Sequence, residues 1–251
     1  MKDSINLENK IIIISGASSG IGRSCAINCD KNGARLVLIA RNQVRLKQTV
    51  SLLSNRNHIV ISVDLTDFND LKLKLKKLFT EINCIHGIIN AAGISLTMPF
   101  KLFKPKHLED TFKINVTAAF YLTKLLLPNF DKNGGSIVFL SSIMSNISDK
   151  GKTIYSITKG AVSAGTRSLA LEYAAKKIRV NSVAPGIVKT PMTKNSTYMI
   201  NKDLNKKTLD SYPLGFGEPE DISNVCIFLI SDAAKWITGS EIVIDGGFSV
   251  K

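Results

Sequence analysis

The sequence predicts an α/β protein, a single domain over residues 1–251 with a doubly wound, seven-stranded parallel sheet and helices on both faces. Seven short β-branched apolar runs alternate with longer segments of helical periodicity, which is the order of a parallel sheet. The runs are apolar almost throughout, as in strands buried on both faces. With 251 residues, 44% of them apolar, the chain is long enough to bury one such sheet.

The strands and helices are expected in regular order. The predicted strands are Lys10–Ser15, Arg35–Ala40, His58–Val63, Ile85–Asn90, Ser136–Ser141, Ile178–Val183 and Glu241–Ile244. The predicted helices cover about 20–31, 42–54, 67–82, 105–129, 153–176 and 218–231.

One polar segment, about residues 190–212, breaks this alternation and is rich in Lys, Asn and Thr. It follows the sixth strand, and ligands of such sheets bind beyond the carboxyl ends of the strands. We therefore expect 190–212 to form a substrate-binding loop or lid. An ordinary surface insertion is the alternative.

The net charge of +13, from 33 basic and 20 acidic residues, does not predict a nucleic-acid partner. The charge is spread along the chain, and its one local run, Lys72 to Lys77, alternates with leucines on a predicted helix. No aromatic residues are interleaved with the basic ones, as single-stranded nucleic-acid sites require. A solvated helix face explains the run.

Membrane and disulfide-rich classes are also disfavoured. No stretch of 18 apolar residues is present, so we expect no membrane partner. The four cysteines lie in apolar segments without any Cys-x-x-Cys pair, which excludes the common zinc and thioredoxin spacings. A reducing, cytoplasmic location is expected.

A glycine-rich turn joins the first strand to the first helix. Gly16 permits a tight turn, Gly20 lets the backbone approach a pyrophosphate, and Gly22 allows close packing of helix on strand. The helix N-terminus offers unpaired N–H groups to the phosphates. The turn therefore predicts a Rossmann dinucleotide-binding fold, although its G-x-x-x-G-x-G spacing differs from the common G-x-G-x-x-G.

The end of the second strand indicates which dinucleotide is bound. An acidic residue there would hold the ribose 2′-hydroxyl of NAD, but the strand ends in Ala40 and is followed by Arg41. A guanidinium suits a 2′-phosphate, so NADP(H) is preferred over NAD(H). Asp64, after the third strand, is a candidate for the adenine amino group; it could equally cap the next helix, a role that Asp67 could also fill.

Tyr155 and Lys159 are four residues apart on a predicted helix, so they face the same way. A free phenol has a pKa of about 10, and a nearby ammonium together with an oxidised nicotinamide would lower it. The pair is thus a candidate general acid/base. Ser142, at the carboxyl end of the fifth strand, can bond a substrate carbonyl oxygen.

These motifs together resemble the classical short-chain dehydrogenase/reductase family, and the resemblance runs from about Leu7 to Phe248. Ser15 replaces the family's usual Thr, and Ala91 replaces an Asn in Asn90-Ala91-Ala92-Gly93, so some hydrogen bonds of that motif are expected to be missing. A C-terminal signature, Trp236 to Gly239 followed by Asp245-Gly246-Gly247, also matches.

The resemblance implies the site. The implied catalytic residues are Asn115, Ser142, Tyr155 and Lys159. Tyr155 would protonate the alkoxide that forms on hydride transfer, Ser142 would orient its oxygen, Lys159 would lower the pKa of Tyr155, and Asn115 would hold a water that resupplies the proton. The implied cofactor contacts are Gly16, Ser18, Ser19, Gly20, Ile21, Gly22, Arg41, Asp64, Leu65, Asn90, Ala91, Gly93, Tyr155, Lys159, Pro185, Gly186, Val188 and Thr190. No metal is needed, and His58, His86 and His107 are interpreted as structural.

The substrate stays open between two hypotheses. The segment Tyr212 to Ile222 resembles 3-oxoacyl-ACP reductases, for which Lys132, Lys176 and Lys177 are candidate contacts to an acidic carrier protein. Thr97-Met98-Pro99-Phe100 instead resembles assorted secondary reductases, which favours a sugar or small-alcohol oxidoreductase. A non-catalytic NADP-binding regulator is a distant alternative. The resemblance also implies a homotetramer that pairs through the helices at about 105–129 and 153–176.

Overall fold

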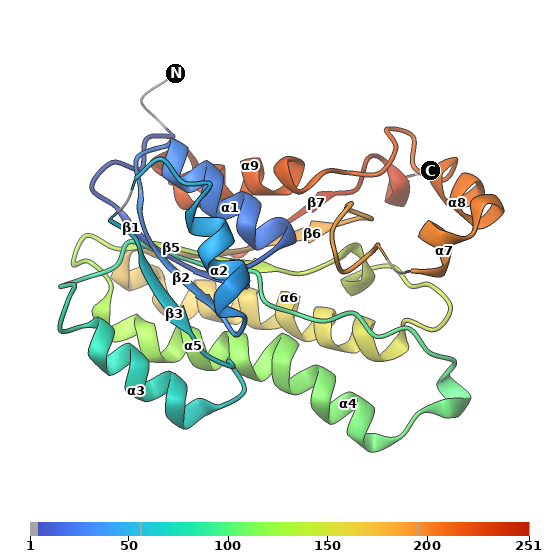
Figure 1. Cartoon of the computed structure of the whole chain (residues 1–251), viewed down its shortest axis with the longest axis horizontal. Helices are drawn as coiled ribbons and strands as arrows, with labels where there is room; N and C mark the ends of the chain where they lie inside the picture. Colours follow the sequence, from blue (N-terminus) through green and yellow to red (C-terminus); the bar gives the residue numbers. More distant parts are fainter. Residues whose placement is uncertain (1–4, 56, 195, 251) are drawn as a thin grey trace.

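The computed structural model describes residues 5–55, 57–194 and 196–250 and confirms the predicted fold class. Seven parallel strands form one sheet in the order β3-β2-β1-β4-β5-β6-β7, with the chain order reversing between β1 and β4 (Figure 1). The strands are β1 (Ile11–Ser15), β2 (Arg35–Ala40), β3 (Ile59–Ser62), β4 (Gly87–Asn90), β5 (Gly135–Leu140), β6 (Ile178–Pro185) and β7 (Glu241–Ile244). Ligands of such sheets bind where the order reverses, beyond the carboxyl ends of the strands.

Helices cover both faces of the sheet, as predicted. Figure 1 shows α1 (Gly20–Lys31), α2 (Gln43–Val50) and α9 (Pro219–Ile230) on one face. The other face carries α3 (Phe68–Leu78), α4 (Pro105–Phe112), α5 (Ala118–Leu126) and α6 (Thr153–Tyr173). Two short helices, α7 (Thr197–Ile200) and α8 (Lys202–Leu209), stand beside the carboxyl edge of the sheet.

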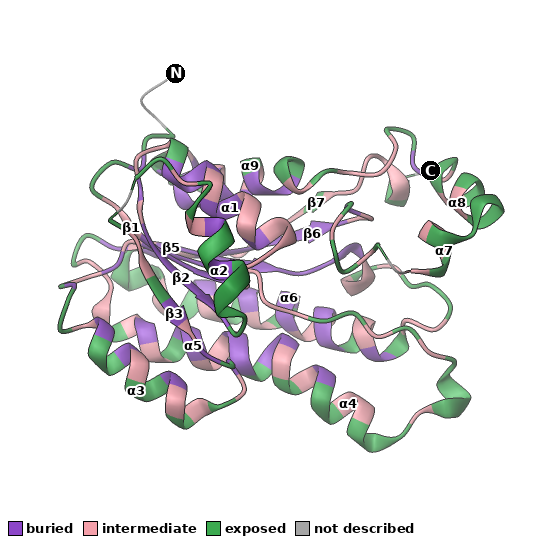
Figure 2. Cartoon of the chain, viewed as in Figure 1, coloured by how far each residue is buried: buried purple, intermediate pink, exposed green. Residues whose placement is uncertain are grey.

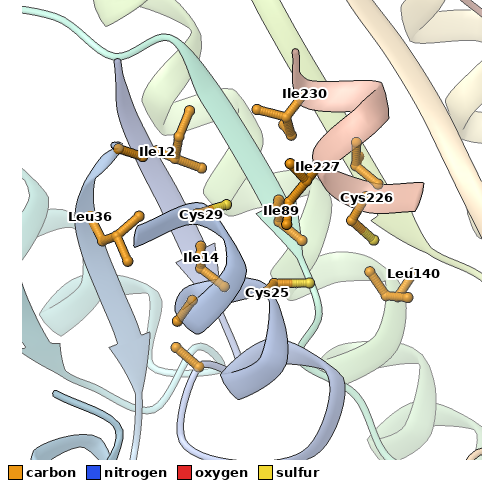
Figure 3. Packing of buried hydrophobic residues seen from close by; sticks show 14 of the residues in the cluster. Ile12, Ile14, Cys25, Cys29, Leu36, Ile89, Leu140, Cys226, Ile227 and Ile230 are labelled. Atoms are coloured by element: carbon orange, nitrogen blue, oxygen red, sulfur yellow. The ribbon is translucent and has the colours of Figure 1, made fainter. Parts of the chain in front are cut away.

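Two apolar cores, one on each face, hold the layers together. The central strands are buried on both sides (Figure 2), which explains their continuous apolar sequences. On the first face α1 packs on α9, and Cys25, Cys29 and Cys226 meet there among isoleucines (Figure 3). These three thiols are fully buried, so they act as small apolar side chains.

The prediction of one continuous helix over 105–129 is wrong. A π-helical turn, Lys113–Thr117, separates α4 from α5, and a short 3₁₀ turn, Leu127–Asn129, follows. The apolar pattern continues through the turn, since it buries Val116 as well as Asn115, and so the extra residue left no gap in the periodicity. π-turns inside α-helices are frequent at functional sites.

The polar segment 190–212 is not an irregular loop, since it contains α7 and α8. Asn201 is the N-cap of α8, and its side chain accepts a hydrogen bond from the backbone N–H of Leu204 at 3.0 Å. Neither helix buries a residue, which explains why no apolar periodicity marked them. Residue 195, within the predicted lid, lies outside the described residues.

Within the described ranges, no helix is both long and apolar enough to cross a membrane.

Candidate active site

A cavity of about 550 Å³ opens at the carboxyl edge of the sheet. Its floor comes from the segments that follow β4, β5 and β6, and the lid segment adds Met192, Tyr198 and Leu204. Of the residues predicted for the site, it brings together Ile21, Ala91, Gly93, Ser142, Tyr155, Lys159, Pro185, Gly186, Val188 and Thr190. Its size suits a small molecule.

The glycine turn lies beside the cavity, between β1 and α1. Gly16 has a φ of +70°, and a Cβ there would lie 2.7 Å from the backbone N of Ala92. A Cβ on Gly22 would collide with the carbonyl of Gly16. Ser19 is the N-cap of α1, but its side chain makes no capping hydrogen bond, so the first N–H groups of the helix are left for a ligand. The turn therefore has the shape that a bound pyrophosphate requires.

Gly20 and Ile21 connect this turn to the cavity. A Cβ on Gly20 would lie 3.3 Å from the Cβ of Thr190, so the segment after β6 comes close to the turn. Ile21 lines the cavity itself. The side chain of Arg23, which the sequence did not single out, donates to the carbonyl of Ser18 at 2.7 Å and to Thr49 Oγ1 at 3.0 Å. This residue braces the turn from behind.

Arg41 and Asp64 lie at the ends of neighbouring strands, outside the cavity. Arg41 is exposed. Asp64 Oδ1 accepts hydrogen bonds from the backbone N–H and the hydroxyl of Thr66, both at 2.8 Å, and these bonds lower the pKa of its carboxyl. Asp67 is the cap of α3, since it accepts from the N–H of Asp70 at 3.1 Å. The alternative in which Asp64 caps that helix is therefore wrong.

Asn90 ends β4 and is almost fully buried. Its Nδ2 donates to Thr123 Oγ1 at 3.0 Å, whereas its Oδ1 has no partner among the described residues. A buried amide oxygen without a donor is uncommon. Leu65 is likewise buried, next to Asp64 at the end of β3.

Three side chains from two elements form the centre of the cavity. Ser142 follows β5, while Tyr155 and Lys159 lie one turn apart on α6. Ser142 and Tyr155 share a side-chain hydrogen bond. Lys159 Nζ lies 5.6 Å from the centroid of the Tyr155 ring and donates to the backbone carbonyl of Leu140 at 2.6 Å.

Burial shifts the pKa values of Tyr155 and Lys159 in opposite directions. Burial raises the pKa of Tyr155 to about 12, and the bond with Ser142 offsets this only in part. Burial also lowers the pKa of Lys159 to about 8, while Glu241 acts in the opposite direction. The Lys159 ammonium is bound to the Leu140 carbonyl. A lowered Tyr155 pKa therefore stays a prediction for the protein with an oxidised nicotinamide bound.

Asn115 lies in the π-helical turn and is 2% exposed. Its Oδ1 accepts from the backbone N–H of Ile94 at 2.8 Å, and its Nδ2 donates to the Ile94 carbonyl at 2.9 Å and to Thr158 Oγ1 at 3.1 Å. Both amide protons are used, so only one lone pair of Oδ1 remains for a water. The side chain therefore joins the loop after β4 to α6.

Glu241, the first residue of β7, is a site residue that the sequence analysis missed. Its carboxylate accepts from Ser145 Oγ at 2.7 Å, Asn146 Nδ2 at 2.8 Å and Ser182 Oγ at 3.0 Å, and also from Ser163 Oγ. Burial alone would raise the pKa of Glu241, but the serine hydroxyls, Ser163 foremost, hold it below its ordinary value. A negative charge thus lies behind the catalytic segment, and no local pattern marked it.

Ser145 connects this carboxylate to the segment that carries Ser142. Its hydroxyl contacts both Glu241 and the backbone carbonyl of Ser142, the latter at 2.7 Å. Ser163 makes a similar connection to the Lys159 turn of α6, since its hydroxyl bonds the Lys159 carbonyl at 3.1 Å. Glu241 is therefore tied to the backbone of two of the predicted catalytic residues.

The lysines expected at a carrier-protein contact are not near the cavity. Lys132 precedes β5, and Lys176 and Lys177 precede β6, so all three lie at the amino edge of the sheet. The cavity is at the carboxyl edge. This part of the prediction is wrong, because residues that precede parallel strands lie at the edge of the sheet opposite the ligand site.

The histidines support the backbone. His58, His86 and His107 each accept a backbone N–H at Nδ1, from Leu36, Ile11 and Lys104 respectively. His86 lies near Cys84 and Asp131, with ligand atoms within 4.8 Å of one another. Because Nδ1 of His86 accepts a hydrogen bond from the Ile11 N–H, the neutral ring carries its own proton on Nε2, and neither nitrogen has a free lone pair for a metal. This tautomer argues against a metal there.

Comparison with known proteins places the chain in a family. A family model described as enoyl-(acyl carrier protein) reductase matches residues 16–249. An L-xylulose reductase from Caenorhabditis elegans is 33% identical, with 99% of each chain covered. A 3-oxoacyl-(acyl-carrier-protein) reductase from Thermotoga maritima is 31% identical over 98% of this chain and 100% of its own.

A solved structure agrees with these relatives. The carveol dehydrogenase from Mycobacterium avium in complex with NAD superposes with a TM-score of 0.92, at 26% identity, and the match covers 98% of this chain and 99% of that one. The chain belongs to the classical short-chain dehydrogenase/reductase family. It is an oxidoreductase that acts on a carbonyl or alcohol group, and a nicotinamide cofactor is expected for it.

Proposed function

We propose that the protein is an NADP(H)-dependent carbonyl reductase in which Asn115, Ser142, Tyr155 and Lys159 are the catalytic residues. The observation that carries this proposal is the convergence of Ser142, Tyr155 and Lys159 on one cavity beside the glycine turn. A bound nicotinamide would supply the hydride in reduction or accept it in oxidation. The chain's own residues then handle the oxygen and the proton.

Tyr155 is the proton donor in reduction and the base in oxidation. A hydroxyl at Ser142 bonds the same substrate oxygen and orients it, so the developing negative charge is stabilised by two hydroxyl donors. A pKa of about 12 favours the protonated phenol, which suits the acid role. Oxidation needs the phenolate, and Lys159 would stabilise it if its ammonium moved from the Leu140 carbonyl toward Tyr155.

Asn115 supports this arrangement through the backbone. By pairing with both polar groups of Ile94 it holds the loop after β4 against α6. The remaining lone pair of its Oδ1 is available to a water that connects Lys159 with solvent. Gly93 adjoins this point, since a Cβ there would lie 3.1 Å from Asn115 Oδ1 and 3.9 Å from Lys159 Nζ.

NADP(H) is proposed over NAD(H) because of the side chains at the end of β2. Ala40 provides no carboxylate for a ribose hydroxyl, and exposed Arg41 is free to meet a 2′-phosphate. Asp64 lies next to it, at the end of β3, as a candidate for the adenine amino group. The carveol dehydrogenase of similar structure was solved with NAD, so the preference of this chain for NADP(H) has to be measured.

Two substrate classes remain as candidates. The Thermotoga relative supports a 3-oxoacyl thioester on a carrier protein, and the Caenorhabditis relative supports a keto-sugar or small ketone. The position of Lys132, Lys176 and Lys177 at the far edge of the sheet weakens the carrier-protein contact predicted from them. A non-catalytic regulator is disfavoured because all four catalytic positions are occupied.

The proposal is tested by following NADPH oxidation with an acetoacetyl thioester, both on coenzyme A and on carrier protein, and with a panel of keto-sugars and simple ketones. Reduction of any of these by the wild type, with NADPH preferred to NADH, is the expected result. Turnover with NADH but not with NADPH would contradict the cofactor assignment. Failure to bind either nucleotide would contradict the proposal as a whole.

The proposal extends to assembly and location. It treats residues 1–251 as one domain, with 190–212 as the substrate lid, working as a homotetramer in the cytoplasm. Exposed apolar side chains support the tetramer: Leu171 on α6 is 84% exposed, and Trp236, before β7, is 97% exposed. The free cysteines are consistent with a reducing compartment. Light scattering at micromolar concentration should give four times the chain mass; a monomer mass would contradict the assembly.

A further inference from the structure

Lys152 brings a positive charge into the substrate side of the cavity. It is the N-cap residue of α6, three residues before Tyr155. Its Nζ lies 5.6 Å from the centroid of the Tyr155 ring, and the residue lines the cavity. This is a second ammonium beside the phenol, on the side away from Lys159 along the helix.

The side-chain contacts of Lys152 do not neutralise its positive charge. Its Nζ donates to Ser95 Oγ at 3.0 Å and to Thr97 Oγ1 at 2.6 Å, both of them neutral hydroxyls. Within the described residues no carboxylate forms an ion pair with it. An ammonium has three protons, so one remains for a ligand.

Asp149 is the nearest acidic influence on this lysine, and it points elsewhere. Its Oδ1 accepts from the backbone N–H of Lys150 at 2.7 Å, and it affects Lys152 only through space. Burial lowers the pKa of Lys152, which means that the charged form has lost water that nothing nearby fully replaces. An anion in the cavity would supply that replacement.

Holding the loop after β4 does not explain Lys152. That loop already meets the segment before α6 through the backbone, since the N–H of Met98 donates to the Gly151 carbonyl at 2.9 Å. Gly151, with a φ of +76°, packs directly on Met98. The hydroxyls of Ser95 and Thr97 therefore orient the Lys152 ammonium, and the loop after β4 does not depend on that ammonium for its position.

We infer that Lys152, oriented by Ser95 and Thr97, binds an anionic oxygen group, a carboxylate or a phosphate, on the same small molecule whose carbonyl meets Tyr155. The inference rests on the proposed function of this site. Because Tyr155 and Lys152 are so close, the carbonyl and the anion must be only a few bonds apart. The substrate class is thus a short oxo acid or a phosphorylated ketone or keto-sugar, and an uncharged thioester is disfavoured.

The test compares the charged and neutral members of two pairs, and the members of each pair share the same ketone group. The pairs are acetoacetate with methyl acetoacetate, and dihydroxyacetone phosphate with dihydroxyacetone. Each is titrated into the full-length protein saturated with NADP⁺, which cannot donate a hydride to the ketone, and binding is measured by calorimetry. In the wild type the charged member of at least one pair should bind about tenfold more tightly than its neutral partner. The pair that shows this preference distinguishes a carboxylate from a phosphate.

Three variants identify the group responsible. Lys152→Gln should abolish the preference, and Lys152→Arg should restore most of it. Lys150→Gln, an exposed lysine two residues away that does not line the cavity, is the matched control and should keep the preference. Unchanged affinity for NADPH and an unchanged melting temperature show that each variant is folded.

Two results would overturn the inference. One is a wild type that binds charged and neutral members equally in both pairs. The other is a Lys152→Gln variant that keeps the full preference or weakens both members to the same extent. NADPH oxidation, measured in separate samples that contain NADPH, reports on the proposed function. Reduction of the neutral members without a charge preference supports the reductase and contradicts only the anion subsite.

Discussion

Backbone atoms form most of the nucleotide side of the site, whereas side chains form most of the substrate side. On the nucleotide side, backbone and glycines form the turn between β1 and α1, where side chains would collide. On the substrate side, side chains from α6, the loop after β4 and the lid line the cavity. Backbone geometry suits a ligand that does not vary, whereas side chains on exposed helices can change one at a time. The comparison predicts that changes on one side leave the other intact.

The largest separation of the two sides is expected from Tyr155→Phe. Loss of the phenolic hydroxyl removes the proton donor but almost no volume, so turnover should fall by about a thousandfold or more. NADPH affinity should stay within about twofold, as measured by nicotinamide fluorescence. Tyr173→Phe, at the far end of the same helix, is the matched control. A kcat that stays at the wild-type value would remove Tyr155 from the mechanism.

The converse change is Gly22→Ala, which acts on the nucleotide side. Its Cβ would collide with the Gly16 carbonyl, so the turn must open, and NADPH affinity should fall by roughly 100-fold or more. Gly160→Ala is the control, because a Cβ there would lie 4.0 Å from its nearest neighbour. It should leave affinity unchanged and stabilise α6 slightly, by up to about 1 kcal/mol in thermal unfolding. Equal NADPH affinities in the two variants would contradict the backbone cradle.

On the nucleotide side, Arg41→Ala should distinguish NADPH from NADH. NADPH affinity should fall by roughly 10- to 100-fold, because a charge-assisted contact to the 2′-phosphate is lost. NADH affinity should not change. Arg45→Ala, another exposed arginine four residues along, should affect neither nucleotide. Equal losses for NADPH and NADH in Arg41→Ala would show that this side chain does not recognise the 2′-phosphate.

The smallest expected effect is a pH shift in Glu241→Gln. The Glu241 charge raises the pKa of Lys159 against burial, so its removal lowers that pKa below the wild-type value of about 8. Lys159 then loses its proton at lower pH, and the alkaline fall of carbonyl reduction should move down by up to about one pH unit. The shift belongs to the coupled Tyr155–Lys159 pair.

Its control is Glu172→Gln, an exposed glutamate on α6. The pH profile of kcat/KM, measured for both variants, distinguishes an electrostatic role from a structural one. A merely structural role of Glu241 would lower the whole profile without moving it. An alkaline limb that stays in place would therefore refute the charge effect.

The nucleotide side was also the more predictable from sequence. The strands and Gly16, Gly20 and Gly22 are local features, set by periodicity and by backbone geometry, and so they can be read in one dimension. The spacing of Tyr155 and Lys159 placed them correctly on one helix face. Lys152 lies just outside that predicted helix, so the same rule did not apply to it.

Other features depend on contacts that no local pattern records. Glu241 meets serines from the segment after β5, from α6 and from β6, and only the folded sheet brings them together. The raised pKa of Tyr155 reflects burial, which the sequence does not report at a single position. Helices α7 and α8 have no buried face, so periodicity could not distinguish them from a loop.

The π-helical turn at Lys113–Thr117 has a consequence for how this site can change by insertion and deletion. A π-turn holds one residue more than an α-helix needs over the same rise. Removing one residue between 113 and 117 would let α4 and α5 merge into one regular and more stable helix. It would also rotate Asn115 away from Ile94 and Thr158. Such a deletion would also turn α4 by about 100° relative to α5, because each helical residue adds that much rotation, so the apolar face of α4 would leave the core. The turn therefore serves both the site and the packing of these two helices.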